Sequence, residues 1–166
     1  GCTGIKFAMN VQKDFEKFFE LFHQEKVKYL IVGVHALGFH GVPRLTVDID
    51  VFAESKPANA RRVTAAVRRF GFNINGRQRE EFMAPDAVMR LGYPPVRIDI
   101  MTSLSGVSFS RAWKHRVRRR YGNVDVWYLS KEDLIVNKHA SGRKQDLVDL
   151  EILLRSKKKA SSKRRR

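Results

Sequence analysis

Hydrophobic residues near the start of the chain follow first a helical and then a strand-like pattern. Phenylalanines recur at helical spacing within Phe15–Phe22, which predicts a helix with one buried face, capped by Asn10 or Asp14. The apolar run Val27–Val32 has the length of a short buried strand, and Gly33 ends it. A buried helix followed by a buried strand is therefore expected.

The next segments predict a short helix, a strand and a longer helix. His35–His40 is long enough for one or two helical turns. In Leu45–Phe52, apolar and polar residues alternate with the two-residue period of a strand that has one buried face. Ser55 and Pro57 form a helix-start signal, and Gly71 is placed to end that helix. Helices and strands thus alternate along this part of the chain.

Three further apolar segments predict strands in the second half of the chain, namely Ala87–Leu91, Val96–Met101 and Val124–Tyr128. The basic segment Arg111–Arg120 lies between the last two, and its residue pattern indicates neither helix nor strand. Strands interspersed with helices in this order predict an α+β fold with a mixed β-sheet flanked by helices.

A helical segment is expected near the end of the chain. Ser130 is a suitable N-cap, and the helical pattern continues to about Leu154, with a break expected at Gly142. The residues after this pattern are mostly basic and include no apolar side chain larger than alanine. We therefore expect one domain over residues 1–155 and a disordered basic tail over residues 156–166.

Three aspartates are placed to share one face of the predicted sheet. Asp48 and Asp50 lie two residues apart on one strand, so both side chains project from the same face with Cβ atoms about 7 Å apart. Asp99 has the same alternation on another strand, and neighbouring strands lie only about 4.8 Å apart. The three carboxylates converge if the two strands are neighbours.

These aspartates suit a divalent metal ion, because clustered carboxylates repel one another unless a cation compensates their charge. Mg²⁺ or Mn²⁺ is the expected ion for such oxygen donors. Two ions would activate an attacking hydroxyl and stabilise a leaving pyrophosphate. The alternative is that Asp48 and Asp50 only occupy the solvent-facing side of an amphipathic strand. Spacing alone leaves both interpretations open.

Gly33 and Val34 lie where the first predicted strand turns into a helix. Backbone N–H groups at the start of a helix attract anions such as phosphates. As an isolated feature this indication is weak, because glycine between a strand and a helix is often only a turn residue.

The chain is strongly basic, with 33 Lys and Arg residues against 17 Asp and Glu and a formal net charge of +16. Such a surplus favours a polyanionic partner, above all nucleic acid, although it is also compatible with a merely soluble surface. Two segments concentrate the charge. Lys157–Arg166 holds seven basic residues, and Arg111–Arg120 interleaves basic residues with an aromatic one.

The basic segment Arg111–Arg120 suits a phosphate backbone and a stacked base, because Trp113 lies among its cations and Tyr121 follows directly. The alternative is a solvated charged loop with one aromatic residue anchored in the core. The candidate residues for nucleic-acid binding are Arg116, Arg118, Arg119 and Arg120.

The compartment is expected to be reducing, because Cys2 is the only cysteine and can form neither an internal disulfide nor a thiolate metal cluster. Apolar stretches such as Val47–Ala53 are too short to cross a bilayer, and no signal-peptide pattern opens the sequence. We therefore expect a cytoplasmic protein with no membrane partner.

The order of these motifs is more specific than any single motif. In chain order they are Ile31-Val32-Gly33 with Ala36, His40-Gly41, Pro43-Arg44, Thr46, Asp48-Ile49-Asp50, Arg97-Ile98-Asp99-Ile100, and the helical segment from Leu129 with Lys138, Arg143, Asp146 and Asp149. In this order they resemble the DNA polymerase β-like nucleotidyltransferase superfamily, in particular its minimal members and the toxin-like proteins related to them. The resemblance covers roughly residues 29–154.

This resemblance implies a role for each acidic residue and for the turn. Asp48 and Asp50 would bind the metal, and Asp99 would complete the metal site and help to activate the acceptor hydroxyl. The turn at Gly33 and Val34 would hold the triphosphate of an NTP. The family turn usually has Gly or Ser where Val34 stands, so the bulk of Val34 and its missing hydroxyl bear on nucleotide binding.

Two cations of the helical segment are candidates for binding phosphates. Lys138 and Arg143 are placed to neutralise a nucleotide, although Arg143 is also spaced to form a structural ion pair with Asp146. His35 and His40 lie close to the turn. We expect both histidines to pack or to form hydrogen bonds rather than to act in catalysis.

Two functions are compatible with these features. The first is a metal-dependent nucleotidyltransferase that moves a nucleoside monophosphate from an NTP to a nucleic-acid hydroxyl, with tRNA-like RNA favoured, or to a protein hydroxyl. Such a protein would act as a toxin-type component with a protein partner of antitoxin type. The second is a catalytically impaired fold that serves as a basic nucleic-acid-binding or regulatory module. The three aspartates favour the first function, and Val34 favours the second.

Overall fold

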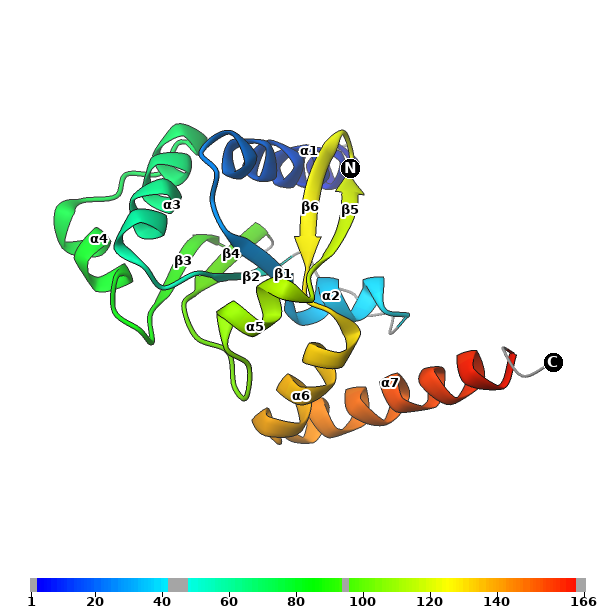
Figure 1. The fold of residues 1–166 in the computed structure, drawn as a ribbon. Coiled ribbons are helices and arrows are strands. Elements are labelled where there is room, and N and C mark those ends of the chain that lie inside the picture. Colours follow the sequence, from blue (N-terminus) through cyan, green and yellow to red (C-terminus); the bar gives the residue numbers. More distant parts are fainter. Residues whose placement is uncertain (1–2, 42–47, 94–95, 164–166) are drawn as a thin grey trace.

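The computed structural model describes residues 3–41, 48–93 and 96–163, and side chains at residues 13–33, 35–41, 48–93 and 97–155. Helices and strands are interspersed along it (Figure 1). The strands are β1 (Tyr29–Val32), β2 (Ile49–Ala53), β3 (Val88–Tyr93), β4 (Val96–Met101), β5 (Val117–Tyr121) and β6 (Val124–Tyr128). The helices are α1 (Thr3–Gln24), α2 (Gly33–Phe39), α3 (Pro57–Phe70), α4 (Gly76–Phe82), α5 (Phe109–Lys114), α6 (Lys131–Ser141) and α7 (Lys144–Lys163).

The six described strands form one mixed sheet in the order β3-β4-β2-β1-β6-β5. The pairs β2–β4 and β1–β6 are parallel, and the other neighbours are antiparallel. In Figure 1, α1 and α3 lie on one side of the strands, and α2, α6 and α7 lie on the other. A mixed sheet flanked by helices agrees with the predicted α+β class at this coarse level. No described helix has both the length and the apolar character that a membrane span requires.

The predicted phenylalanine stripe forms the centre of the core. Phe15, Phe18, Phe19 and Phe22 are all buried on α1. Phe19 stacks on Tyr29 of β1 with ring centroids 5.6 Å apart, and Phe22 contacts the same ring edge-on. These contacts fix the position of β1, whose end carries the glycine turn described below.

Two helix boundaries differ from the prediction. α1 begins at Thr3, upstream of both predicted caps Asn10 and Asp14, because a helix that is stabilised by packing can propagate backwards without a capping side chain. α7 continues to Lys163, past the predicted end near Leu154. Lysine and alanine favour helix even where no apolar pattern marks it. The division into a domain and a tail stays a prediction.

The basic segment Arg111–Arg120 has regular structure, so it is not the loop of the alternative interpretation, although Trp113 does pack against the core as that interpretation expected. Its first part belongs to α5 and its last part to β5, which pairs with β6 at one edge of the sheet. The tight turn between β5 and β6 explains this outcome, because Gly122 has a φ of 59° there.

Helix α4 was not predicted, although its start has a recognisable sequence signal. The Gln78 backbone N–H donates to the Asn75 side chain at 2.8 Å, and the Asn75 N–H donates to the Gln78 side chain at 3.0 Å. This reciprocal capping box stabilises a helix too short to show an apolar period. The predicted helix ends at Gly71 and Gly142 are confirmed, and both glycines have the left-handed conformation.

Candidate active site

Two of the three predicted aspartates are direct neighbours across the sheet. Asp50 of β2 and Asp99 of β4 are register partners in the parallel pair β2–β4. Asp48 immediately precedes β2, and its carboxylate is half-buried. Asp50 and Asp99 therefore meet as strand alternation predicted, because β2 and β4 are adjacent strands. Residues 45–47 of the predicted strand lie outside the described residues.

The turn after β1 lies against the Asp50 carboxylate. Gly33 follows Val32, the register partner of Asp50, and has a φ of 65°. A Cβ atom added to Gly33 would stand 2.3 Å from Oδ2 of Asp50, so the Asp50 side chain would have to shift. Glycine is thus required both by the backbone conformation and by the close approach of the carboxylate. Val34 belongs to the first turn of α2, and its side chain lies outside the described ones.

Asp50 carries a strongly perturbed carboxyl group. Burial, together with the charges of Asp99 and Asp48, raises its pKa to about 6 against the opposing charges of Arg97 and Lys138. A carboxylate that resists ionisation beside two other acids is a position where an added cation would be favourable.

Two arginines hold the other carboxylates. The guanidinium of Arg97 lies 3.2 Å from Oδ2 of Asp48 and 3.8 Å from Oδ1 of Asp99. Nε of Arg90, on the edge strand β3, donates to Oδ1 of Asp99 at 3.0 Å. As these side chains stand, no three acidic, histidine or cysteine side chains of the described residues form a group able to hold a metal ion. The carboxylate oxygens of these acids suit Mg²⁺ or Mn²⁺. To bind there, such an ion would have to replace the Arg97 guanidinium beside Asp48 and Asp99.

Asp50 lines a pocket of about 350 Å³ together with three of the four predicted nucleotide-binding residues, while the side chain of Val34 lies outside the described ones. Gly33 lines it from the turn, Lys138 lines it from α6, and Arg143 lines it from the segment between α6 and α7. One pocket thus combines an acidic group, a tight glycine turn and two cations. Polar side chains that the sequence did not single out also line it, namely Ser103, Ser105 and Asn137.

Lys138 is buried and held by two acids of α7. Its Nζ lies 2.8 Å from Oδ1 of Asp146 and 3.6 Å from Oδ2 of Asp149, both of which are buried. Burial works to raise the pKa of Asp146, but hydrogen bonds from Lys138, Ser141 and Arg143 lower it well below its usual range. The ammonium group is therefore fixed at the wall of the pocket.

Arg143 forms the ion pair that was predicted as the alternative to a ligand role. Its Nε donates to Oδ2 of Asp146 at 2.8 Å, while most of its side chain is exposed at the pocket. A guanidinium has further N–H donors, so this ion pair leaves hydrogen-bonding capacity for an anion. The two interpretations are compatible in one side chain.

The two histidines near the turn make packing and hydrogen-bond contacts. His40 donates from Nε2 to the backbone carbonyl of Leu129 at 2.9 Å, which ties the end of α2 to the chain just before α6. His35 packs edge-on against Phe15, and burial lowers its pKa. Neither histidine is among the residues that line the pocket with Asp50.

Arg116 is a structural residue. Its guanidinium lies 4.0 Å from the ring centre of Trp113 and 4.6 Å from that of Trp127, and it donates to the Trp113 carbonyl at 2.6 Å. A cation held between two indole rings is not available to a phosphate without loss of these contacts.

The other three predicted nucleic-acid-binding arginines are exposed on the edge strand β5. Arg118 pairs with Asp125, and Arg119 lies over the ring of Phe39 at 5.2 Å. Arg120 donates to the backbone carbonyl of Asn123 at 3.0 Å. A guanidinium has more N–H donors than these local contacts use, so the three exposed arginines remain candidates for phosphate contacts.

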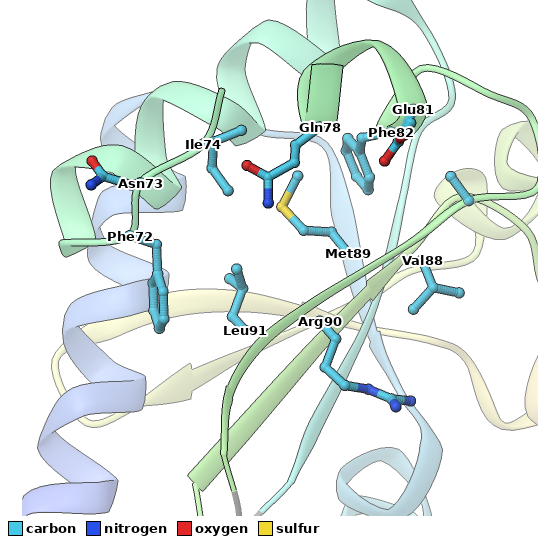
Figure 2. A pocket seen from close by; sticks show the side chains of 11 residues that line it. Phe72, Asn73, Ile74, Gln78, Glu81, Phe82, Val88, Met89, Arg90 and Leu91 are labelled. Carbon is cyan, nitrogen blue, oxygen red and sulfur yellow. The ribbon is translucent and has the colours of Figure 1, made fainter. Parts of the chain in front are cut away.

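A second pocket, of about 370 Å³, lies between α4 and β3 (Figure 2). Met89 and Leu91 project into it beside Phe72 and Ile74, whereas the Arg90 side chain extends away from these residues. Successive residues of β3 point to opposite faces, so this pocket and the Arg90–Asp99 pair lie on opposite sides of the strand. The slightly larger pocket is therefore not the one that Asp50 lines.

The pairing of the carboxylates with arginines was missed in the sequence. Arg97 precedes Asp99 by two residues on one strand, so the alternation that located the acids also places Arg97 on their face. Arg90 gives no such signal, because its contact with Asp99 depends on the register between β3 and β4.

Comparison with known families agrees with this geometry. Residues 9–155 match a family described as a nucleotidyltransferase of unknown function (DUF6036). No curated protein was found to match the chain. The family match confirms the resemblance to minimal nucleotidyltransferases, and it spans every element from α1 to most of α7. The chain therefore belongs to the family of nucleotidyltransferases of unknown function.

Proposed function

We propose that this protein is a metal-dependent enzyme that moves a nucleoside monophosphate from an NTP to an acceptor hydroxyl. One observation carries the proposal: Asp50 shares a pocket of about 350 Å³ with Gly33, Lys138 and Arg143. An acid beside two cations in one cavity suits a divalent ion and a triphosphate bound next to each other. The description of the family supports the same reaction class.

Each functional residue of the site has a separate role in this proposal. Gly33 lets the backbone approach the nucleotide closely, and the fixed ammonium of Lys138 neutralises phosphate charge. The exposed N–H groups of Arg143 bind the outer phosphates. In the transfer step, the acceptor oxygen bonds to the α-phosphorus, the bond to pyrophosphate breaks, and Asp99 receives the hydroxyl proton.

The carboxylates of Asp48, Asp50 and Asp99 would hold Mg²⁺ or Mn²⁺ after Arg97 moves away from Asp48. When bound, such an ion stabilises charge on the transferred phosphate and lowers the pKa of the acceptor hydroxyl. The raised pKa of Asp50 supports this assignment, because the crowded acids lack sufficient positive charge.

The acceptor we propose is nucleic acid, with tRNA-like RNA favoured over a protein hydroxyl. The net charge of +16 and the exposed arginines Arg118, Arg119 and Arg120 support a polyanionic acceptor. A toxin-type role with a protein partner of antitoxin type is part of the same proposal, and it rests on the resemblance of the sequence motifs.

The test is incubation of the purified protein with Mg²⁺, each α-labelled NTP in turn, and total RNA. Label is expected on RNA, and label on the protein itself would identify a protein acceptor instead. Asp48→Asn and Asp50→Asn should each abolish labelling, whereas the matched control Asp14→Asn changes an exposed acid on α1 and should label normally. Normal labelling by both site variants would refute the metal-site assignment.

A catalytically impaired, basic binding module is the second candidate. The pairing of Arg97 with Asp48 and of Arg90 with Asp99 favours it, because arginines then serve as the permanent counter-charges of the acids. This candidate predicts no labelling with any NTP, together with salt-dependent RNA binding that Asp50→Asn leaves unchanged.

A further inference from the structure

Register pairing places four residues in one row across the sheet. Val32 of β1 pairs with Asp50 of β2, and Asp50 pairs in turn with Asp99 of β4. Asp99 pairs with Arg90 of β3, which completes the row. Register partners project from the same face of a sheet, and neighbouring strands lie about 4.8 Å apart. The row therefore runs from the end of β1, through two of the acids, to Arg90 on a described edge strand.

The two ends of this row have different surroundings. The β1 end meets the turn at Gly33 and the pocket that Lys138 and Arg143 also line, where the proposed function places the triphosphate. At the other end, no described strand lies beyond β3. The Arg90 side chain is 60% exposed, and Val88, two residues earlier on the same strand face, is 61% exposed. The β3 edge is thus the side from which an acceptor reaches the acids.

Arg90 is oriented by Asp99 but retains hydrogen-bond donors. Its Nε donates to Oδ1 of Asp99 at 3.0 Å, and its Nη2 donates to Oδ2 at 3.4 Å. A guanidinium carries five N–H donors, so these two contacts leave donors for an anion. Figure 2 shows the side chain extending away from Met89 and Leu91, which belong to the second pocket on the opposite face of β3. The carboxylate therefore holds an exposed cation beside the acids.

We propose that Arg90 binds the phosphate next to the acceptor hydroxyl, at the 3′ end of an RNA strand. This inference rests on the proposed function and adds how the acceptor is bound. Asp99 receives the proton of the hydroxyl, and Arg90 lies one strand spacing, about 4.8 Å, further toward the sheet edge. Arginine suits this position because paired N–H donors match two phosphate oxygens.

The order of groups along the row also defines the kind of acceptor. The triphosphate occupies the β1 end, so a strand end fits at Asp99, whereas a strand that continued past Asp99 would meet the NTP. A ribose hydroxyl lies within a few bonds of the phosphate of its own nucleotide, so one nucleotide spans Asp99 and Arg90. A protein hydroxyl has no such phosphate beside it. Arg90 therefore favours RNA over a protein acceptor.

The test removes the guanidinium, the charge of one phosphate, or both. The probe is a short single-stranded RNA labelled with fluorescein at its 5′ end, with either an ordinary or an uncharged methylphosphonate linkage before its last nucleotide. Fluorescence anisotropy with Mg²⁺ and without any NTP measures binding by the full chain whether or not nucleotide transfer occurs. The neutral linkage should weaken binding to the wild type about tenfold, because a charge-assisted hydrogen bond is lost. Binding to Arg90→Gln should weaken less than about twofold, because its contact is already absent.

Two controls and a kinetic measurement accompany this test. A neutral linkage near the 5′ end should weaken wild-type binding less than about twofold. Arg77→Gln also removes an exposed arginine that is paired with an acid, but on α4, and it should respond to the neutral 3′ linkage like the wild type. Where transfer is detected, Arg90→Gln should raise the KM for the RNA about tenfold and leave the KM for the NTP within about twofold. Arg90→Lys keeps the charge without the planar fork, so its KM for the RNA should lie in between.

An equal loss of affinity in the wild type and in Arg90→Gln on neutralising the 3′ linkage would overturn the proposal, and so would no loss in the wild type. Arg90 would then serve only as the counter-charge of Asp99. No transfer with any NTP, together with the expected linkage effect, would refute the proposed reaction but support the contact of Arg90 with the RNA end. Circular dichroism checks that each variant folds. If Arg90→Gln does not fold, Arg90→Lys replaces it, and the neutral linkage should weaken its binding less than that of the wild type.

Discussion

Asp50→Asn should stabilise the metal-free protein at neutral and higher pH. Burial and the neighbouring charges of Asp99 and Asp48 raise the pKa of Asp50 to about 6, from 3.8 in the unfolded chain. The folded state therefore binds this proton more tightly than the unfolded state does. The free energy of unfolding must fall as pH rises from about 4 to about 6, and the loss persists above that range. Asparagine carries no charge and removes this loss.

The size of the effect follows from the pKa difference. The gap between 3.8 and about 6 corresponds to about 3 kcal/mol at roughly 1.4 kcal/mol per pKa unit. Asp50 is partly solvent-exposed and Arg97 and Lys138 compensate some of its charge, so a gain of about 1–2 kcal/mol is expected. For a chain of this length, that is an increase in Tm of about 3–6 °C.

The assay is thermal unfolding with a chelator present, at about pH 4 and about pH 8. Asp50→Asn should unfold at a higher temperature than the wild type only at the higher pH. Asp48→Asn is the matched comparison: it relieves part of the repulsion on Asp50 but also removes the partner of Arg97, so its gain should be smaller than that of Asp50→Asn. Added Mg²⁺ should raise the Tm of the wild type more than that of Asp50→Asn. A lower Tm for Asp50→Asn than for the wild type at the higher pH would refute the conclusion that the ionised Asp50 carboxylate destabilises the folded protein.

Three further changes test other parts of the structure. Gly33→Ala should lower the free energy of unfolding by about 1–3 kcal/mol in a denaturant titration and reduce nucleotide binding, because the added Cβ would stand 2.3 Å from the Asp50 carboxylate. Gly38→Ala is the control: its Cβ meets no atom within 4 Å, so neither quantity should change. Arg116→Ala should lower the free energy of unfolding by about 1–2 kcal/mol, because its contacts with the two indole rings are lost. Arg120→Ala should leave stability unchanged but reduce the slope of log affinity for RNA against log salt concentration by about 0.7. Deletion of Lys157–Arg166 should leave the Tm nearly unchanged but reduce that slope by up to about five units, and an unchanged slope would show that the tail makes no phosphate contact.

The elements with a clear apolar period could be predicted from the sequence. Val96–Met101 and Val124–Tyr128 have the predicted bounds, because each shows strand alternation between turn residues. Gly71 and Gly142 end helices as expected, because a left-handed residue is needed there. The face shared by the acids was also predictable, since alternation fixes the side of a strand on which a residue lies.

What could not be predicted depends on register and on side-chain partners. Nothing in the sequence states that β4 pairs with β2, and Asp99 meets Asp50 only through that pairing. The contact of Arg90 with Asp99 depends in turn on the register of β3. Arg116 was predicted to bind nucleic acid, yet it also contacts Trp127 of β6, and no local pattern reveals that contact.

The parallel pairing of β1 with β6 has a consequence for synthesis on the ribosome. It joins Ile31 to Tyr128, two of the most widely separated segments of the sheet. Lys138 follows still later, so the acids and the turn leave the ribosome long before the cation that shares their pocket. Pairings between distant segments form slowly because a long loop must close first. The nascent chain therefore carries an incomplete pocket until α6 is released.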